Sequence, residues 1–472
     1  MIWIAILNAE GQYAQALEFL YGRLNFERTD AAPHHTAIFK LDRMRELLAE
    51  LGHPESHAPI VHVAGTKGKG STAGFVSNMA SAAGYRVGCY TSPHLLRLEE
   101  RFAVDGLPCS EAELVELVEA IRPAIQTLDE RGDANGLAPL TFFEITTALA
   151  FLHFQRRDVQ LTVLEVGLGG RLDSTNVCQP VVCIITSISF DHMRQLGNTL
   201  AAIAGEKAGI IKPQIPVITG VTQQEPLDVI VDKADECRAP LSCLGRDFDF
   251  RYRAPSSLDN SRPEMDLVRI SNGRQSPIAE KLQLAALGQH QAANASLAWM
   301  ACDELMRHGF TIDDDARRAG LATGRCPARI EIVRRLPTVI IDTAHNAASI
   351  QALVQVLSES FTETKRTLIL AASRDKDVSG MLHRLVPEFE TIVCTRYLKN
   401  PRSMATDELA RHARRIATAE GAVVDILTAD SPAAAWQLAN ATHETDHLIC
   451  ATGSFFLAAE MKETLEALRK AN

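Results

Sequence analysis

Residues 63–75 read VAGTKGKGSTAGF, a stretch in which three glycines and two lysines fall within six positions. It follows an apolar run, PIVHVA, and precedes STAGFVSNMASAAG, whose pattern is typical of a helix. A strand, a glycine-rich loop and a helix in this order allow backbone N–H groups and a helix N-terminus to bind phosphate. The stretch therefore predicts a nucleotide phosphate loop in an α/β fold; the alternative is a glycine-rich turn with incidental lysines.

The loop departs from the usual pattern G-x-x-x-x-G-K-[ST], because Val63 and Gly70 occupy the positions of its first glycine and its Ser or Thr. Gly68 and Lys69 form the Gly-Lys pair that stands next to the helix start. We therefore expect Lys69 to contact phosphate, whereas Lys67 lies two residues earlier, where its side chain could point outward instead.

A β-branched run, a turn and a helical pattern recur along the whole chain. The runs include LTVLEVG, VVCIITSIS, TVIIDTAHN, TLILAAS and HLICATGS. Such near-continuous apolar strands are typical of parallel sheets covered by helices on both faces. We predict an α/β protein in which a P-loop-type, mostly parallel sheet domain is followed by a smaller Rossmann-like α/β domain. Gly324 and Pro327 interrupt the pattern before a new series begins at Thr338, so we place the two domains at residues 1–324 and 325–472.

Local signals predict individual elements. Ser110 precedes EAELVELVEAI and, with Glu113 three residues later, forms the sequence of a capping box. Apolar residues at helical spacing predict a helix over residues 347–357. The polar, proline-containing residues 251–266 are expected to form a hairpin or loop excursion.

Composition excludes several classes of function. The chain has 472 residues, with 48 basic and 58 acidic side chains and a net charge of −10, which argues against broad nucleic-acid binding. Its apolar runs are too short to span a bilayer, and its N-terminus lacks the basic region of a secretion signal. Its ten cysteines lack C-x-x-C spacing and are expected to be buried thiols. We expect a cytoplasmic monomer that binds neither nucleic acid nor membrane.

Polar residues at the ends of the predicted strands indicate where a ligand binds. In open parallel sheets, ligands bind at the carboxyl ends of the strands. Glu165 ends the run LTVLE, where a carboxylate can hold Mg²⁺ beside a phosphate loop. Asp191 and His192 follow another strand and form either a metal site or a capping Asp beside a structural His. Lys207 lies in an apolar helical pattern, where a lysine is costly unless it is paired, modified or extended to solvent.

In order along the chain, these segments resemble the folylpolyglutamate synthase and dihydrofolate synthase family, relatives of the Mur ligases. The segments that carry the resemblance include HVAGTKGKGSTAGF, CYTSPHLLRLEERF, LTFFEITTALAF, EVGLGGRLDSTN, SFDHMRQLGNTLAAIAGEKAGIIKP, LGQHQAANA, DTAHN, ASRDKDV and ATGSFFLAAE. The family joins glutamate to the γ-carboxylate of a folate, or to the carboxylate of dihydropteroate, while ATP becomes ADP and phosphate. The resemblance implies an ATP-dependent ligase whose substrates are folate or dihydropteroate, L-glutamate and ATP. It implies addition of glutamate to tetrahydrofolate and also to dihydropteroate.

The resemblance also implies roles for particular residues. It assigns ATP binding to Thr66, Lys67, Gly68, Lys69, Gly70, Ser71, Asn294, Arg329 and Asp342. It assigns Mg²⁺ to Ser92, Glu165 and His192, and a second metal to Lys207, which is carbamoylated in relatives. It assigns the pteridine site to Thr141, Phe142, Phe143, Glu144, Leu172, Asp173 and Ser174. It places His345 near the phosphate or the incoming glutamate, so that Lys69, Lys207 and His345 are the expected catalytic residues.

The chain departs from the family pattern at a few positions. Lys67 replaces an Asn, Glu99 stands where Asn is frequent, Ala328 replaces the Gly of PGR, and Thr343 and Ala347 replace the Gly and Pro of DGAHNP. None of these changes removes a charged or metal-binding group.

Two other functions are compatible with parts of the pattern. A Mur-type ligase for cell-wall precursors usually carries a nucleotide-sugar domain before the loop, and we expect the 64 residues that precede Gly65 to be too few for it. A catalytically dead nucleotide-binding protein should have lost at least one of Lys69, Glu165, His192 and Lys207, and all four are present.

Overall fold

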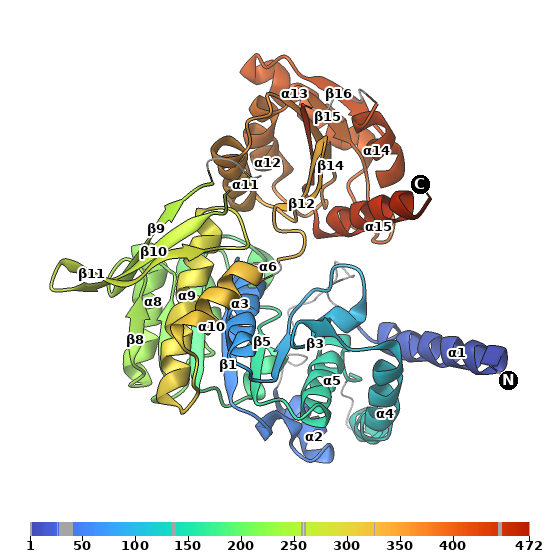
Figure 1. Cartoon of the computed structure of the whole chain (residues 1–472). Helices are drawn as coiled ribbons and strands as arrows, with labels where there is room; N and C mark the ends of the chain where they lie inside the picture. The colour runs from blue at the N-terminus through green and yellow to red at the C-terminus, as the bar shows by residue number, and fades with distance from the viewer. Residues whose placement is uncertain are drawn as a thin grey trace. The chain divides into compact units, whose positions relative to one another are not determined.

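The computed structural model describes residues 2–25, 27, 41–134, 138–255, 258, 261–324, 326–441 and 446–471. The chain divides into two compact units. The first comprises Met1–Arg251, Met265–Gln283 and Gln291–Gly324, and the second comprises Tyr252–Glu264, Leu284–His290 and Arg325–Asn472. Figure 1 labels many of the elements of both units. Among the described residues, no helix is both long and apolar enough to cross a membrane.

The first unit is built on an eight-stranded sheet with the order β4-β3-β2-β5-β1-β6-β7-β8. Its strands are β1 (Ile60–Ala64), β2 (Val87–Tyr90), β3 (Phe102–Val104), β4 (Leu107–Pro108), β5 (Leu161–Glu165), β6 (Val182–Ile185), β7 (Val217–Thr219) and β8 (Leu241–Cys243). The run from β2 to β8 is parallel, and β3 and β4 add an antiparallel edge. Every residue of β1, β5 and β6 is buried, as expected for strands covered on both faces. The predicted mostly parallel sheet is therefore confirmed.

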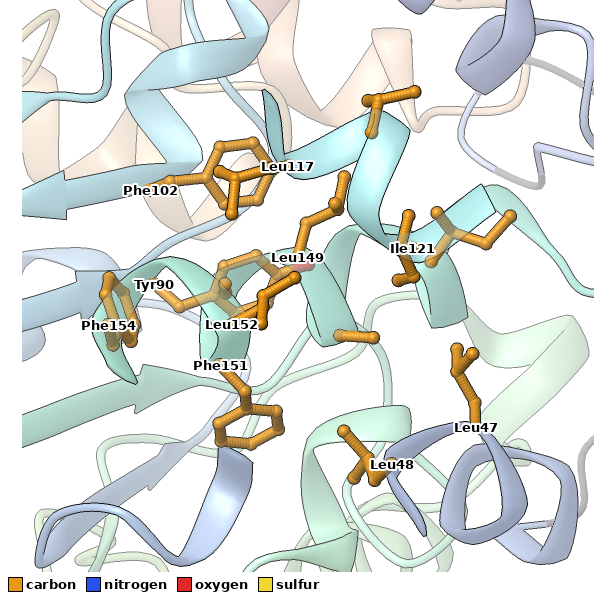
Figure 2. Packing of buried hydrophobic residues seen from close by; sticks show 14 of the residues in the cluster. Leu47, Leu48, Tyr90, Phe102, Leu117, Ile121, Leu149, Phe151, Leu152 and Phe154 are labelled. Carbon is orange, nitrogen blue, oxygen red and sulfur yellow. The ribbon is translucent and has the colours of Figure 1, made fainter. Parts of the chain in front are cut away.

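Helices cover this sheet and form its cores. They are α1 (Ile2–Tyr21), α2 (Leu41–Glu50), α3 (Lys69–Ala82), α4 (Glu111–Ala134), α5 (Phe142–Arg156), α6 (Met193–Leu196), α7 (Leu200–Ala208), α8 (Gln224–Glu236), α9 (Gln289–Arg307) and α10 (Asp314–Thr323). Figure 2 shows side chains of α2, α4 and α5 packed with Tyr90 and Phe102 in one of these cores. Phe154 fills the space over Gly88, where an added Cβ would lie 2.6 Å from the ring. The predicted capping box at α4 is confirmed, since Ser110 N donates to Glu113 Oε2 and Glu113 N donates to Ser110 Oγ.

Residues 251–266, predicted as a hairpin or loop excursion, comprise the end of one strand, the start of the next and the connection between them, in a separate three-stranded sheet. Its strands are β9 (Phe248–Arg253), β10 (Glu264–Ser271) and β11 (Arg274–Gln283), in the order β11-β10-β9. Ser256, Ser257, Asp259 and Asn260 of the connection lie outside the described residues.

The second unit, whose residues from 326 onward are coloured orange to red in Figure 1, holds a six-stranded sheet with the order β12-β13-β17-β14-β15-β16. Its strands are β12 (Glu331–Arg335), β13 (Thr338–Ile341), β14 (Lys365–Leu370), β15 (Thr391–Cys394), β16 (Asp425–Thr428) and β17 (His447–Thr452). Its helices are α11 (Ala347–Ser360), α12 (Val378–Leu385), α13 (Thr406–Glu420), α14 (Pro432–Ala439) and α15 (Phe455–Ala471). Only β12 is antiparallel to its neighbour, so the second unit is also α/β. The helix predicted over residues 347–357 is confirmed as α11, which the Asn346 side chain caps.

Candidate active site

The candidate site of the first unit lies where the sheet changes its direction of winding. After β1 the chain crosses to β2, beyond β5, whereas after β5 it crosses to β6, beyond β1. These connections leave the sheet in opposite directions, and such a point opens a crevice at the carboxyl ends of the strands. Val63 of β1 pairs with Glu165 of β5, and Ala64 pairs with Ile185 of β6. The loop after β1 therefore lies between Glu165 and the segment that follows β6.

Hydrogen bonds to the segment after β6 fix the backbone of the phosphate loop. Thr66 N donates to Ser187 O at 2.7 Å, and Thr186 Oγ1 donates to Lys67 O at 2.6 Å. Gly65 has φ 146°, and a Cβ there would lie 1.9 Å from Thr186 Oγ1. The loop shape thus depends on a glycine at its first position.

Gly68 brings the loop close to helix α9. Its φ is 86°, and an added Cβ would lie 2.2 Å from Asn294 Oδ1. Asn294 is buried, and its side-chain amide donates to Gln291 Oε1 at 3.1 Å. The structure therefore brings Asn294 and the loop together, as the proposed shared role in ATP binding requires.

The two loop lysines have different partners. Lys69 begins α3, and its Nζ lies 3.9 Å from Glu165 Oε1. Lys67 extends to the segment after β6, where its Nζ donates to Asp191 Oδ2 at 2.8 Å. Helix α3 begins at Lys69. Its N-terminal amides, the Lys69 side chain and the buried Ser71 therefore lie together at the end of the phosphate loop.

The residues expected to hold Mg²⁺ are only partly brought together. Glu165 is buried, and its Oε2 accepts a hydrogen bond from Ser92 N at 3.1 Å. A carboxylate beside a serine is an oxygen donor set of the kind that Mg²⁺ prefers. His192 is half-exposed with φ 50°, and its Nε2 lies 3.9 Å from Asp191 Oδ1. Within the described part of the chain, no group of three or more His, Cys, Asp or Glu side chains forms a ready metal site.

Lys207 is a buried lysine in the last turn of α7. It is 4% exposed, and its Nζ donates to the main-chain oxygen of Gly65 at 2.9 Å. Burial lowers the pKa of Lys207 to about 7, and the positive charge of Lys69 acts in the same direction, while Asp191 opposes it. A substantial fraction of this amine is therefore uncharged near neutral pH.

The segment 141–144 contains residues that hold the fold together. Glu144 Oε2 accepts from both the main-chain N and the Oγ1 of Thr141, which caps α5, and Arg43 Nη2 donates to the same carboxylate at 2.8 Å. Phe142 is buried and stacks on Tyr21 with 5.5 Å between ring centroids. Phe143, by contrast, is half-buried.

Phe143 and the loop after β5 pack closely. A Cβ on Gly167 would lie 2.3 Å from Phe143 Cζ, so the glycine makes this contact feasible. Leu172 and Ser174 are half-buried on either side of the buried Asp173.

Asp173 organises the loop in which it lies. Its Oδ2 accepts from Leu168 N at 2.9 Å, and its Oδ1 accepts from Thr175 Oγ1 at 2.5 Å. The Oγ1 of Thr175 lies in turn 2.8 Å from His62 Nε2 in the centre of β1. Burial raises the pKa of Asp173, which the hydrogen bonds oppose. The sequence analysis did not single out His62, although a histidine inside an apolar strand is a signal for such a contact.

In the second unit, Asp342 connects two segments that are distant in sequence. It follows β13 and is buried, and burial raises its pKa. Its Oδ2 accepts from Ile330 N at 3.0 Å, and its Oδ1 accepts from Ala344 N at 2.7 Å. Arg329 is thereby held beside residues 342–344, and its Nη1 donates to Thr343 Oγ1 at 2.6 Å.

His345 has a defined local environment. Its Nδ1 lies 2.9 Å from Thr343 O, a geometry in which Nδ1 carries the proton and donates it. In that tautomer, Nε2 is the basic nitrogen. The structure therefore collects Arg329, Asp342 and His345 within one short region at the carboxyl end of β13.

A second polar cluster lies at the carboxyl ends of β14, β15 and β17. Ser373 Oγ and Tyr397 Oη are 2.7 Å apart, and Ser454 lies near Tyr397. Asp375 bridges Arg402 at 2.7 Å and Lys376 at 3.9 Å. The motifs ASRDKDV and ATGS indicated parts of this cluster, but the sequence offered no signal for Tyr397.

The family models of known proteins match both units. The Mur ligase middle domain matches residues 125–302, and the Mur ligase glutamate ligase domain matches residues 328–455. The dihydrofolate synthase/folylpolyglutamate synthase of Bacillus subtilis is 38% identical over 375 residues, which cover 79% of this chain and 82% of that protein.

Solved structures show the same similarity over nearly the whole length. Mycobacterium tuberculosis folylpolyglutamate synthase complexed with ADP aligns with a TM-score of 0.84 and 32% identity, covering 97% of this chain and 98% of that one. Escherichia coli FolC in complex with DHPP and ADP aligns with a TM-score of 0.78 and 29% identity, over 97% and 98% of the two chains. The chain is an ATP-dependent glutamate ligase that belongs to the folylpolyglutamate synthase/dihydrofolate synthase family of the Mur ligase superfamily.

Proposed function

We propose that this protein adds L-glutamate to the γ-carboxylate of tetrahydrofolate and also to the carboxylate of dihydropteroate, with ATP as the energy source. The observation that carries the proposal is the position of Lys69 at the start of α3, 3.9 Å from Glu165 at the end of β5. This pairs a phosphate-binding cation with a carboxylate that can hold the nucleotide's metal. The relatives whose names include both activities support the dual substrate.

The nucleotide is proposed to bind along the loop after β1. Backbone amides of residues 66–71 and the Lys69 ammonium receive the phosphates, and Asn294 lies beside Gly68 to complete this side. Arg329 and Asp342 are the proposed nucleotide contacts of the second unit. The ADP named in the complexes of two relatives supports this assignment.

Two divalent-metal sites are part of the proposal. Glu165 and Ser92 would hold Mg²⁺, with His192 as a further ligand. Lys207 would join a second site after its neutral amine adds to CO₂ and loses a proton, which turns a buried cation into an anionic carbamate. The lowered pKa of Lys207 supports this step, because the unprotonated amine is the reactive form. Bound Mg²⁺ would neutralise charge on the transferring phosphoryl group.

The reaction is proposed to pass through an acyl phosphate. A carboxylate oxygen of the pteroyl substrate attacks the γ-phosphorus of ATP, and ADP leaves. Lys69 stabilises the charge on the transferred group. The amine of glutamate then attacks the acyl carbon, phosphate leaves with its bonding electrons, and the amine loses a proton. The Nε2 of His345 is the proposed acceptor, because its Nδ1 is already committed to Thr343 O.

The proposed substrate sites lie in segments 141–144 and 172–174 of the first unit and at the carboxyl ends of the strands of the second sheet. Phe143, Leu172 and Ser174 are proposed to contact the pteridine, whereas Thr141, Phe142, Glu144 and Asp173 act by holding these segments in place. The incoming glutamate, an anion, is proposed to bind beside Lys376 and Ser454 at the carboxyl edge of the second sheet. All ten cysteines are free thiols, which supports the proposed location in the reducing cytoplasm. A monomeric state stays a prediction.

An assay of phosphate release by the purified chain tests the proposal. ATP, Mg²⁺ and L-glutamate are supplied with dihydropteroate, tetrahydrofolate or a muropeptide, and products are identified by mass spectrometry. Glutamylation of both pterin substrates is expected. Turnover on tetrahydrofolate alone would remove the dihydrofolate synthase activity, and turnover on the muropeptide alone would overturn the proposal.

A further inference from the structure

Thr343 forms a side-chain contact that glycine, the residue the family usually carries here, could not form. Its Oγ1 accepts a hydrogen bond from Arg329 Nη1 at 2.6 Å, and the Thr343 side chain is fully buried. A hydrogen bond from a charged donor to a buried acceptor is among the stronger ones in proteins. The contact therefore fixes the charged end of Arg329.

The backbone on both sides of Arg329 is also fixed. Ala328 N donates to Glu331 Oε2 at 2.7 Å, and Ile330 N donates to Asp342 Oδ2 at 3.0 Å. Ala328 and Ile330 have φ values of 52° and 51°, so Arg329 lies between two left-handed residues. With the main chain held, the remaining freedom lies in the long side chain, and the hydroxyl of Thr343 restricts its tip.

Thr343 also contacts His345 through its backbone. Its carbonyl oxygen lies 2.9 Å from His345 Nδ1, and a glycine would supply this acceptor equally well. The two contacts of Thr343 are therefore separable by mutation, since removal of the hydroxyl affects Arg329 and leaves the carbonyl in place.

We propose that the Thr343 hydroxyl is a positioning group that holds the Arg329 guanidinium ready for an anionic nucleotide. The inference rests on the proposed function, in which Arg329 contacts ATP. Ordering of the side chain before binding lowers the entropic cost of forming the nucleotide contact. Loss of the hydroxyl weakens nucleotide binding and leaves the chemical step unchanged.

Calorimetric titration of the full-length protein with ADP, together with steady-state kinetics, tests this role. Thr343→Val keeps the shape and removes the hydrogen bond, and Thr343→Ser retains the hydroxyl. We expect Thr343→Val to raise the Kd for ADP and the KM for ATP roughly five- to tenfold, with kcat within about twofold of wild type. Thr343→Ser should remain within about twofold of wild type in the Kd for ADP, the KM for ATP and kcat. Arg329→Ala should weaken ADP binding at least as much as Thr343→Val does. In the Arg329→Ala background, Thr343→Val should have no further effect.

Three outcomes overturn the inference in distinguishable ways. Equal losses in Thr343→Ser and Thr343→Val would mean that the hydroxyl is not the acting group. Unchanged ADP binding in Thr343→Val, with weakened binding in Arg329→Ala, would mean that Arg329 needs no positioning. Wild-type ADP binding in Arg329→Ala would remove the nucleotide role of Arg329 and this inference with it, while retained glutamate ligation would leave the rest of the proposed function in place.

Discussion

Lys207 donates a hydrogen bond from Nζ to the main-chain oxygen of Gly65, although 142 positions separate them in the sequence. The contact links the last turn of α7 to the first residue of the phosphate loop. It holds a buried amine whose pKa is lowered to about 7, close to the positive charge of Lys69. A lysine with a lowered pKa is therefore located at the loop.

Carbamoylation of Lys207 should make activity depend on dissolved CO₂. Removal of bicarbonate from protein and buffer is expected to lower turnover, and its return to restore it. Lys207→Arg keeps a cation but cannot carry the carbamate, so we expect a loss of roughly 100-fold or more that bicarbonate does not rescue. Carbon-13 NMR with labelled bicarbonate should show a carbamate carbon in wild type and none in Lys207→Arg. Activity that does not depend on bicarbonate, together with the absence of a carbamate signal in wild type, would contradict the assignment.

The two loop lysines should differ in their effect on catalysis. Lys69 faces Glu165, whereas Lys67 is paired with Asp191, so Lys69→Ala should reduce kcat roughly 100- to 1,000-fold. Lys67→Ala should leave a large residual activity. Phosphate release under saturating substrates measures both variants, and the reverse order of effects would refute the choice of Lys69.

Glu144 should act on stability more than on substrate affinity. Its carboxylate accepts hydrogen bonds from Thr141 and Arg43 in a largely buried position, so Glu144→Ala removes the helix cap and the ion pair of Arg43, whose Nη1 still donates to Ala138 O. We expect a loss of about 3 kcal/mol in the free energy of unfolding. Urea denaturation measures this loss, and the KM for tetrahydrofolate should change little while the protein is folded. Phe143→Leu is the comparison, with a raised KM and a smaller loss of stability; a stable Glu144→Ala with weak folate binding would reverse these roles.

His62 should contribute to acid sensitivity. Burial lowers its pKa from 6.5 to about 3, so the folded state keeps the ring neutral while the unfolded state binds a proton. The stability that a neutral His62 contributes is present above pH 6.5 and is lost as pH falls toward 3, at up to about 1.4 kcal/mol per pH unit.

Urea denaturation at several pH values isolates this contribution. His62→Gln should be less stable than wild type at neutral pH and show a shallower loss between pH 6.5 and about pH 4. Part of the slope should persist, because burial also lowers the pKa values of His153 and His290 to about 4. The exposed His308, replaced by Gln, serves as control and should leave the slope unchanged.

Ala328 should tolerate glycine better than an ordinary alanine does. Its φ of 52° costs an L-residue about 1 kcal/mol. In Ala328→Gly, relief of this strain offsets the loss of the buried methyl group and the greater backbone freedom of glycine in the unfolded chain. We expect Ala328→Gly to change stability by less than about 0.5 kcal/mol, whereas Ala319→Gly on the exposed side of α10 should cost about 1 kcal/mol. Equal costs at both sites in chemical denaturation would show that the strain is negligible.

The sequence was most informative where a local pattern determines the structure. The strand–loop–helix at residues 60–82 and the capping box of Ser110 and Glu113 depend on neighbours within a few positions. These were predicted correctly. Glu165 could also be placed at a strand end from its own run of apolar residues, since a strand's terminus is a local property.

Contacts across the sheet could not be read from one sequence. The position of β1 between β5 and β6 depends on strand order, which periodicity does not encode, and this order brings Glu165 to Lys69. The contact of Thr343 with Arg329 is equally invisible, because it depends on two left-handed residues in a turn that contains no glycine. Thr141 and Glu144 form a capping box at the start of α5, a local pattern that the sequence analysis did not single out, and their assignment to the pteridine site stays a prediction.

The fit of Gly65 under Thr186 bears on how natural variation in this protein should be interpreted. Any side chain at position 65 would collide with the hydroxyl of Thr186 before it reached a ligand. A survey of tolerated substitutions would therefore find position 65 intolerant even in a variant that had lost all affinity for nucleotide. Intolerance at position 65 reflects the close contact between the segments that follow β1 and β6. Whether Lys69 can be replaced is the better measure of whether a related protein still catalyses a reaction.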